Sequence, residues 1–218
     1  AADEGAKWMG LHARTAKQLY SGHAHWPSLA EIKAAARLPI LGNGDIWEAW
    51  DALRMMRDTG VDGVIIGRGC LGRPWLFREL ADVFDGRDPD DPPSLGDVLV
   101  VLRRHAKLLV EFFGEKGGVL ELRKWTAWYT KGFPGSAEVR SRLQTITSLA
   151  EMDEHLAELD PSAAFPTSAL RVSRAKRGGS QDKVSLPPGW LDLGARERVA
   201  RAPRAPSPHV APATGSPP

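Results

Sequence analysis

Two clusters of glycine and polar residues are the part of this sequence best suited to chemistry. They are GNGD at residues 42–45 and GRG at residues 67–69. Glycine has no Cβ, so backbone N–H groups in such turns can approach an anion closely, and Arg68 can add a bidentate contact to a phosphate. Two successive turns of this kind favour a phosphate-binding site. The alternative is that the glycines only make tight turns.

The elements around these clusters are a strand, a helix and a second strand. Apolar runs at residues 40–41 and 64–66 predict two short buried strands, and residues 46–60 predict a helix that ends at a glycine. In that helix we expect an apolar stripe of Ala49, Leu53 and Met56, extended by Trp50. A strand–helix–strand unit implies a parallel sheet, so both glycine clusters fall at carboxyl ends of strands, where α/β proteins bind ligands.

A further strand is predicted before this unit, over residues 8–11, and it places His12 and Arg14 at the same rim of the sheet. Three strand–helix units make only part of a parallel layer. An eight-stranded barrel would need about five more such units upstream, and the last two loops of such barrels often hold a phosphate. Because no initiator Met precedes Ala1, we expect this chain to be the C-terminal part of a longer protein.

Composition narrows the class of protein. The 218 residues are 42% hydrophobic and 26% charged, as in a soluble globular protein, and the net charge of +2 does not by itself indicate nucleic acid. The single cysteine, Cys70, excludes an intrachain disulfide, suits a reducing cytoplasm and is interpreted as a packing residue. No apolar run is long enough to span a membrane. His23 and His25 have no cysteine or carboxylate close by, so no metal site is predicted.

Residues 85–93 are rich in proline and acidic residues and interrupt the pattern. Beyond them, apolar residues recur at the spacing of an α-helix, which predicts a small helical bundle. The first helix should carry an apolar stripe and end near Gly114, and the second should cover residues 120–131. A third helix is predicted from Ser136, and a fourth after a capping box formed by Ser148 and Glu151. The stripe of the first helix comprises Val98, Leu102, Ala106, Leu109 and Phe113.

Basic residues are concentrated in the first three of these helices. Residues 103–142 contain nine Lys or Arg against four Asp or Glu, interleaved with aromatic residues. Such a surface can bind RNA through phosphate contacts and stacking, or it can be a solvated basic face over an aromatic core. The candidates for RNA contact are Arg123, Lys124 and Lys131, with Arg14 at the sheet. Residues 166–218 have no periodic apolar pattern and are predicted to be a disordered, basic tail.

Taken together, five segments resemble the bacterial tRNA-dihydrouridine synthases. They occur in the order and spacing of that family and cover about residues 1–160. Barrels of other kinds that bind FMN also carry a turn like GNGDI, so the specificity lies in the joint match with the helical region. The segments are LHART at 11–15, LYSG at 19–22, LPILGNGDI at 38–46, DGVIIGRGCLGRPWLF at 62–77 and RKWTAWYTKGFPG at 123–135.

The resemblance implies an α/β fold: the C-terminal part of a TIM (β/α)8 barrel, followed by a small all-α helical bundle domain and a disordered tail. The barrel part would be residues 1–84, the helical tRNA-binding domain residues 94–160 and the tail residues 166–218. The family reduces the C5–C6 double bond of particular uridines in tRNA, and NAD(P)H recharges its FMN. A cytoplasmic enzyme with tRNA as its partner is therefore expected, with a monomer as the default.

The resemblance also assigns roles to six residues of this sequence. Asn43, Gly44 and Asp45 would bind FMN after the seventh strand of the barrel. Gly67 and Arg68 would bind the FMN phosphate after the eighth strand. His12 would lie near the flavin at the end of the sixth strand.

The family's catalytic cysteine lies in the first half of the barrel and has no counterpart in this chain. Cys70 does not match it, because Cys70 follows the eighth strand. We therefore expect the chain alone to be inactive and poorly folded, with an open hydrophobic sheet edge. Two other hypotheses remain open: a different FMN- or phosphate-binding barrel oxidoreductase that acts on a small molecule, and a non-catalytic RNA-binding remnant.

Overall fold

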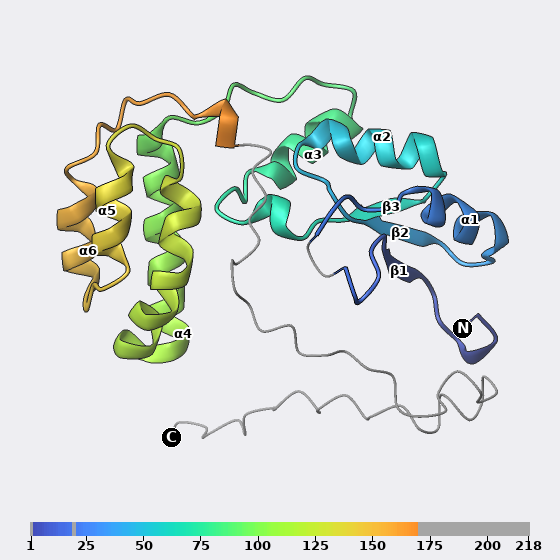
Figure 1. Ribbon diagram of the computed structural model, residues 1–218, viewed down its shortest axis with the longest axis horizontal. Helices are drawn as coiled ribbons and strands as arrows, with labels where there is room; N and C mark the ends of the chain where they lie inside the picture. Colours follow the sequence, from blue (N-terminus) through green and yellow to red (C-terminus); the bar gives the residue numbers. More distant parts are fainter. Residues whose placement is uncertain (1, 19–20, 170–218) are drawn as a thin grey trace, which may run out of the picture. The chain divides into compact units, whose positions relative to one another are not determined.

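The computed structural model describes residues 2–18 and 21–169 of the chain. Its first part contains a parallel sheet in the order β1-β2-β3, with Met9 opposite Ile40 and Leu41 opposite Gly63 (Figure 1). The sheet does not close on itself, and each strand is followed by a helix. The α/β class and the three predicted parallel strands are thus confirmed. The strands are β1 (Met9–His12), β2 (Ile40–Asn43) and β3 (Gly63–Ile65), and the helices are α1 (Pro27–Ala35), α2 (Ala49–Thr59) and α3 (Leu76–Phe84).

The apolar core of this part lies between the sheet and its helices. Ile40 of β2, Leu29 of α1 and Met55 of α2 are fully buried. A Cβ at Gly42 would lie 2.7 Å from the Met55 sulfur, so the Met55 side chain of α2 packs directly against the backbone of β2.

Helix α2 begins later than the sequence predicts. It starts at Ala49 because the Asp51 carboxylate accepts hydrogen bonds from the N–H groups of Trp47 and Glu48, which caps the helix at this point. The predicted end is confirmed, since Gly60 adopts a left-handed conformation with a φ of 71°.

The predicted apolar stripe of α2 is partly confirmed: Ala49 is buried, and Leu53 and Met56 pack against the margin of the core. Ala52 and Met55 are fully buried, whereas Leu53 and Met56 are half-buried and Trp50 is exposed. The buried face also includes Asp51 and Thr59, whose polar groups are satisfied by local hydrogen bonds. The centre of the buried face therefore lies at Ala52 and Met55, and Trp50 does not extend it.

The second part is a bundle of helices that begins with the hairpin α4 (Leu95–Thr130). Its two helical segments run side by side and are joined at Gly114, where φ is 73° (Figure 1). A Cβ at Gly118 would lie 2.6 Å from the Val110 backbone, so the two segments are in close contact. The second segment thus begins directly after Gly114, earlier than predicted. Phe113 is exposed, so it does not belong to the buried stripe.

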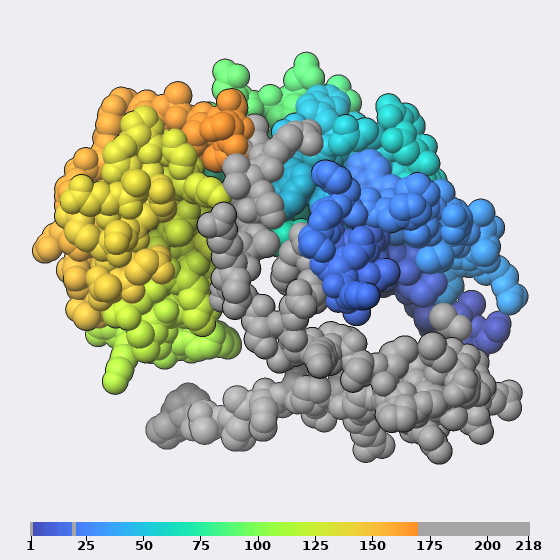
Figure 2. All heavy atoms as spheres, viewed as in Figure 1, coloured from blue at the N-terminus to red at the C-terminus, as the bar shows by residue number. Residues whose placement is uncertain are grey.

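Helices α5 (Ser136–Leu143) and α6 (Leu149–Leu156) complete the bundle, and their predicted buried faces are confirmed. Val139, Leu143 and Ile146 are buried together with residues of α4, and so are Met152, Leu156 and Leu159. The yellow and orange residues of these helices form a closely packed surface (Figure 2).

The start of α6 shows one half of the predicted capping box. The Ser148 hydroxyl accepts a hydrogen bond from the Glu151 N–H at 3.1 Å. The Glu151 carboxylate accepts from the N–H of Thr147 instead of that of Ser148.

The described structure continues past Phe165, where the sequence predicts a disordered tail. The Phe165 ring makes edge contacts with Trp75 and Phe133, and a 3-10 turn follows at Thr167–Ala169. The remainder of the predicted tail, from residue 170, lies outside the described residues, as do Leu19 and Tyr20. Among the helices that are described, none is long and apolar enough to cross a membrane. The division at residues 85–93 into a barrel domain and a helical domain stays a prediction.

The neighbouring methionines of α2 provide a test of the buried face. We expect Met55→Ala to lower the free energy of unfolding by about 2–5 kcal/mol, because it leaves a cavity under β2. Met56→Ala should lower it by about 1 kcal/mol or less, because its side chain is only half-buried. Urea unfolding followed by circular dichroism measures both values. Equal losses would contradict the assignment of the buried face.

Candidate functional site

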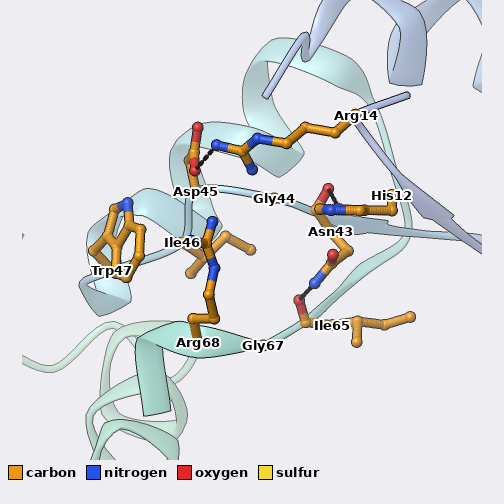
Figure 3. Close-up of a pocket in the computed structure, with 10 residues that line it drawn as sticks. All are labelled: His12, Arg14, Asn43, Gly44, Asp45, Ile46, Trp47, Ile65, Gly67 and Arg68. Carbon is orange, nitrogen blue, oxygen red and sulfur yellow. Dashed lines mark hydrogen bonds and ion pairs between the residues drawn. The ribbon is translucent and has the colours of Figure 1, made fainter. Parts of the chain in front are cut away.

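A pocket of about 210 Å³ lies at the carboxyl end of the sheet (Figure 3). It brings together all six residues for which the sequence suggests cofactor binding, and Arg14 besides. The residues come from the ends of the three strands and from the turns that follow them. The lining consists of His12, Arg14, Asn43, Gly44, Asp45, Ile46, Trp47, Ile65, Gly67 and Arg68.

Side chains at the strand ends hold the three strands in register. His12 and Asn43 are the last residues of β1 and β2. The Asn43 side-chain amide donates a hydrogen bond of 2.6 Å to the carbonyl of Ile65 in β3, and His12 Nδ1 lies 3.4 Å from the Asn43 carbonyl oxygen (Figure 3). These contacts fix the rim of the pocket.

Asp45 shapes the turn after β2. It has a φ of 55°, and no other non-glycine residue in the described part of the chain has a positive φ. Its carboxylate accepts hydrogen bonds of 2.6 Å from the guanidinium of Arg14 and 2.6 Å from the N–H of Ala24. In the same turn, the Gly44 carbonyl accepts from the Trp26 indole N–H. The turn is therefore tied to the loop between β1 and α1.

The ion pair of Arg14 and Asp45 is internal to the protein. The Arg14 side chain is only 2% exposed, and it also donates to the carbonyls of Ser21 and Gly22. Its Nη1 atom is buried and has no hydrogen-bond partner in the described part of the chain. The RNA contact that the sequence suggests for Arg14 stays a prediction. A buried donor of this kind favours an acceptor in the pocket.

The electrostatics of Asp45 follow from this arrangement. Burial acts to raise the pKa of its carboxyl, but the hydrogen bond from Ala24 and the bond and charge of Arg14 outweigh burial. The pKa of Asp45 is therefore lowered from its ordinary value, and the carboxylate is charged at neutral pH.

The glycines of the two turns are needed where the protein packs against itself. A Cβ at Gly69 would collide with the carbonyl oxygen of Ile46, and a Cβ at Gly44 would lie 2.7 Å from the Ala24 Cβ. Around Gly67 there is more room, since the nearest atom to a Cβ would be Asn43 Nδ2 at 3.8 Å. The sequence interpretation considered the approach of an anion and tight turns, but not this packing of one turn against another.

Arg68 provides a second cation at the pocket. Its guanidinium lies 5.4 Å from the centre of the Trp47 ring, a distance at which a cation and an aromatic face attract each other. Arg14 and Arg68 extend toward the turn at Asp45 and Ile46 from opposite sides (Figure 3). With two cations and one carboxylate, the pocket favours an anion such as phosphate. Trp47 was missed by the sequence analysis, although its place directly after the GNGDI motif was an indication.

The remaining candidates lie elsewhere. Arg123 donates hydrogen bonds to the carbonyls of Thr145 and Ile146, Lys124 pairs with Glu121, and Lys131 is exposed at the end of α4. Their role in RNA binding stays a prediction.

Cys70 follows the Arg68 turn and packs against the core of the α/β part. Its thiol donates a hydrogen bond to the Gly67 carbonyl at 3.1 Å. This position agrees with a packing residue.

Comparison with known proteins identifies relatives along most of the chain. A family model described as "Dihydrouridine synthase (Dus)" matches residues 1–167. A "Probable tRNA-dihydrouridine synthase" of Mycobacterium leprae is 51% identical over 86% of this chain and 49% of its own length. A "tRNA-dihydrouridine synthase B" of Xanthomonas campestris is 42% identical over 65% of this chain and 42% of its own length. The chain thus spans about half the length of the relatives that it matches.

The pairing of Arg14 with Asp45 predicts a specific dependence of stability on pH. Because the folded-state pKa of Asp45 is lowered, its contribution is complete above the unfolded-state pKa of about 4 and is lost as the pH falls below it. We expect Asp45→Asn to lower the free energy of unfolding by about 3 kcal/mol at pH 6.

The difference between the two proteins should shrink below about pH 4. Urea unfolding at several pH values measures it. Other carboxyls with lowered pKa values, such as Asp62, remain in both proteins and cancel in the comparison. A difference that does not change with pH would show that the ion pair is not the cause.

Proposed function

We propose, since this chain belongs to the dihydrouridine synthase family, that it is the C-terminal part of an FMN-dependent enzyme that reduces the C5–C6 double bond of uridines in tRNA. NAD(P)H would serve as the reductant. The sheet would be the last part of a TIM barrel, and the helical bundle would help to hold the tRNA.

The pocket at the carboxyl end of the sheet is the observation that carries this proposal. Arg68 is held against Trp47 and the Arg14 Nη1 donor is buried without a hydrogen-bond partner among the described residues, so the residues suit the phosphate of FMN. These groups would hold the phosphate between the turns after β2 and β3.

The size of the pocket fits one part of such a cofactor. Sites for complete small molecules have volumes of about 300–1,000 Å³, and this pocket has about 210 Å³. It has room for a phosphate and the adjoining chain. The flavin ring would then extend past His12, which is exposed at the rim.

The open sheet supports completion by further strands. β1 and β3 each have one unpaired edge within the described structure, and Trp8, which directly precedes β1, is exposed. Unpaired edges with exposed apolar side chains are normally covered. In the proposed enzyme, the remaining strands of a barrel would cover them.

The reaction defines what this chain would supply. Reduction of uridine needs a hydride, which FMN supplies when bound, and a proton from a positioned acid. The described residues would bind and orient the cofactor through Asn43, Arg68 and the turn at Asp45. The Cys70 thiol donates to the Gly67 carbonyl, and this agrees with its assignment as a packing residue. Because Cys70 is assigned as a packing residue and not as the acid that supplies the proton, we propose that the 218-residue chain alone does not form dihydrouridine.

Cofactor binding tests this proposal directly. In a titration of the purified chain with FMN, followed by flavin fluorescence, we expect saturable binding that Arg68→Ala weakens by about tenfold or more, since a charge-assisted hydrogen bond to phosphate is lost. Arg78→Ala is the matched control: it removes a guanidinium of α3 that is exposed and outside the pocket, so the affinity should not change.

Two results would count against the proposal. The pocket would not be the phosphate site if Arg68→Ala and wild type bound FMN equally, or if neither bound it. Formation of dihydrouridine in tRNA by the purified chain with FMN and NADPH would contradict the inactivity that we propose for the chain alone.

A further inference from the structure

The turn of the α4 hairpin carries two exposed aromatic rings. Phe112 is 81% exposed and Phe113 is 54% exposed, and their rings lie edge to face at 4.7 Å. The turn extends past the ends of α5 and α6 (Figures 1 and 2). Large apolar side chains gathered at one exposed point commonly mark an interaction site.

Beside this turn lies a hollow of about 500 Å³ between the second segment of α4 and the chain before α6. Its lining combines apolar side chains with two cations, Lys116 and Arg123, and one carboxylate, that of Glu115. The lining residues are Glu115, Lys116, Val119, Leu120, Arg123 and Thr147.

Arg123 is held in a fixed position at this hollow. Its Nε and Nη2 atoms donate to the Ile146 carbonyl at 2.8 and 2.6 Å, and Nη2 also donates to the Thr145 carbonyl at 3.1 Å. A guanidinium anchored in this way loses little side-chain entropy when it meets an anion. The hollow therefore has one preorganised cation and one, Lys116, on a flexible side chain.

We use the name hairpin tip for the two aromatic residues together with three residues that line the hollow: Phe112, Phe113, Lys116, Leu120 and Arg123. A Cβ at Gly117 would lie 3.2 Å from the Phe113 Cβ, so Phe113 packs beside the helical turn that carries Lys116. Lys116 and Leu120 are one turn apart on the same helix face. Leu120 is itself 47% exposed.

The chemistry of the hairpin tip matches a nucleotide. Exposed aromatic rings accept a base by stacking, and adjacent Lys and Arg side chains accept its phosphate. Glu111, Glu115 and Glu121 are interspersed among the cations, which disfavours a purely electrostatic surface for a polyanion or a membrane. The combination selects an unpaired base with its phosphate.

We infer that the hairpin tip binds an unpaired nucleotide of RNA, with the base stacked on Phe112 or Phe113 and its phosphate held by Lys116 and Arg123. The identification of this RNA as tRNA rests on the proposed function. The site itself is distinct from the FMN pocket in the residues that form it.

Binding of a fluorescently labelled tRNA transcript to the full 218-residue chain, measured by anisotropy, tests the inference. The double variant Phe112→Ser, Phe113→Ser should bind at least tenfold more weakly, because stacking is lost. Lys116→Gln should lower the slope of log affinity against log salt by about one, as expected for one lost phosphate contact.

Val100→Ser is the matched control. Val100 is an apolar residue of the first α4 segment that is 65% exposed, and it lies several helical turns from Gly114. This variant should bind RNA as wild type does. All variants should keep the wild-type circular dichroism and the wild-type FMN titration, which separates this site from the proposed cofactor site.

The inference is overturned if wild type does not bind the RNA, if the phenylalanine variant binds it unchanged, or if Val100→Ser weakens binding equally. It is also overturned if the two phenylalanines prove to mediate self-association, so that the variant becomes monomeric while its RNA affinity stays the same. Suppose that the tip variants lose RNA binding and that wild type binds no FMN. The inference about the hairpin tip would then hold, and the proposed function would be rejected.

Discussion

The buried ion pair between Arg14 and Asp45 is the interaction on which the candidate site depends. It joins the loop after β1 to the turn after β2, and the Ala24 N–H and the Trp26 indole reinforce the same connection. Asp45 can hold its left-handed backbone because its short carboxylate is fixed on both oxygens. Without this pair, the turn that places Asn43 and Gly44 at the pocket would lose its support.

Close backbone packing extends this support to the next turn. Gly69 lies against the Ile46 carbonyl, so the turn after β3 rests on the turn after β2 and carries Arg68 to the pocket. Only a residue without a Cβ permits this approach. The glycines that suggest an anion site therefore have a second role, since they allow two loops to pack on each other at the pocket.

In the helical bundle, the backbone conformation of Gly114 likewise determines which segments pack against each other. Gly114 reverses the chain in α4, and Gly118 lets the two segments approach until the Tyr129 hydroxyl lies 3.1 Å from His105 Nδ1. Burial, together with the nearby Cys70 thiol, raises the pKa of Tyr129 to about 12, and burial lowers the pKa of His105. The reversal at Gly114 also leaves Phe112 and Phe113 at an exposed turn instead of in the core.

The sequence by itself determined the strands, the parallel order and the residues that gather at the pocket, because strand ends and glycine turns are local features. Gly60, Val139, Leu143 and Met152 were likewise predictable from capping and helical period. Only the tertiary structure decided that Met55 rather than Met56 is buried, that Phe113 is exposed and that Arg14 pairs with Asp45. These outcomes depend on what packs against each side chain from distant parts of the chain, and no local pattern contains that information.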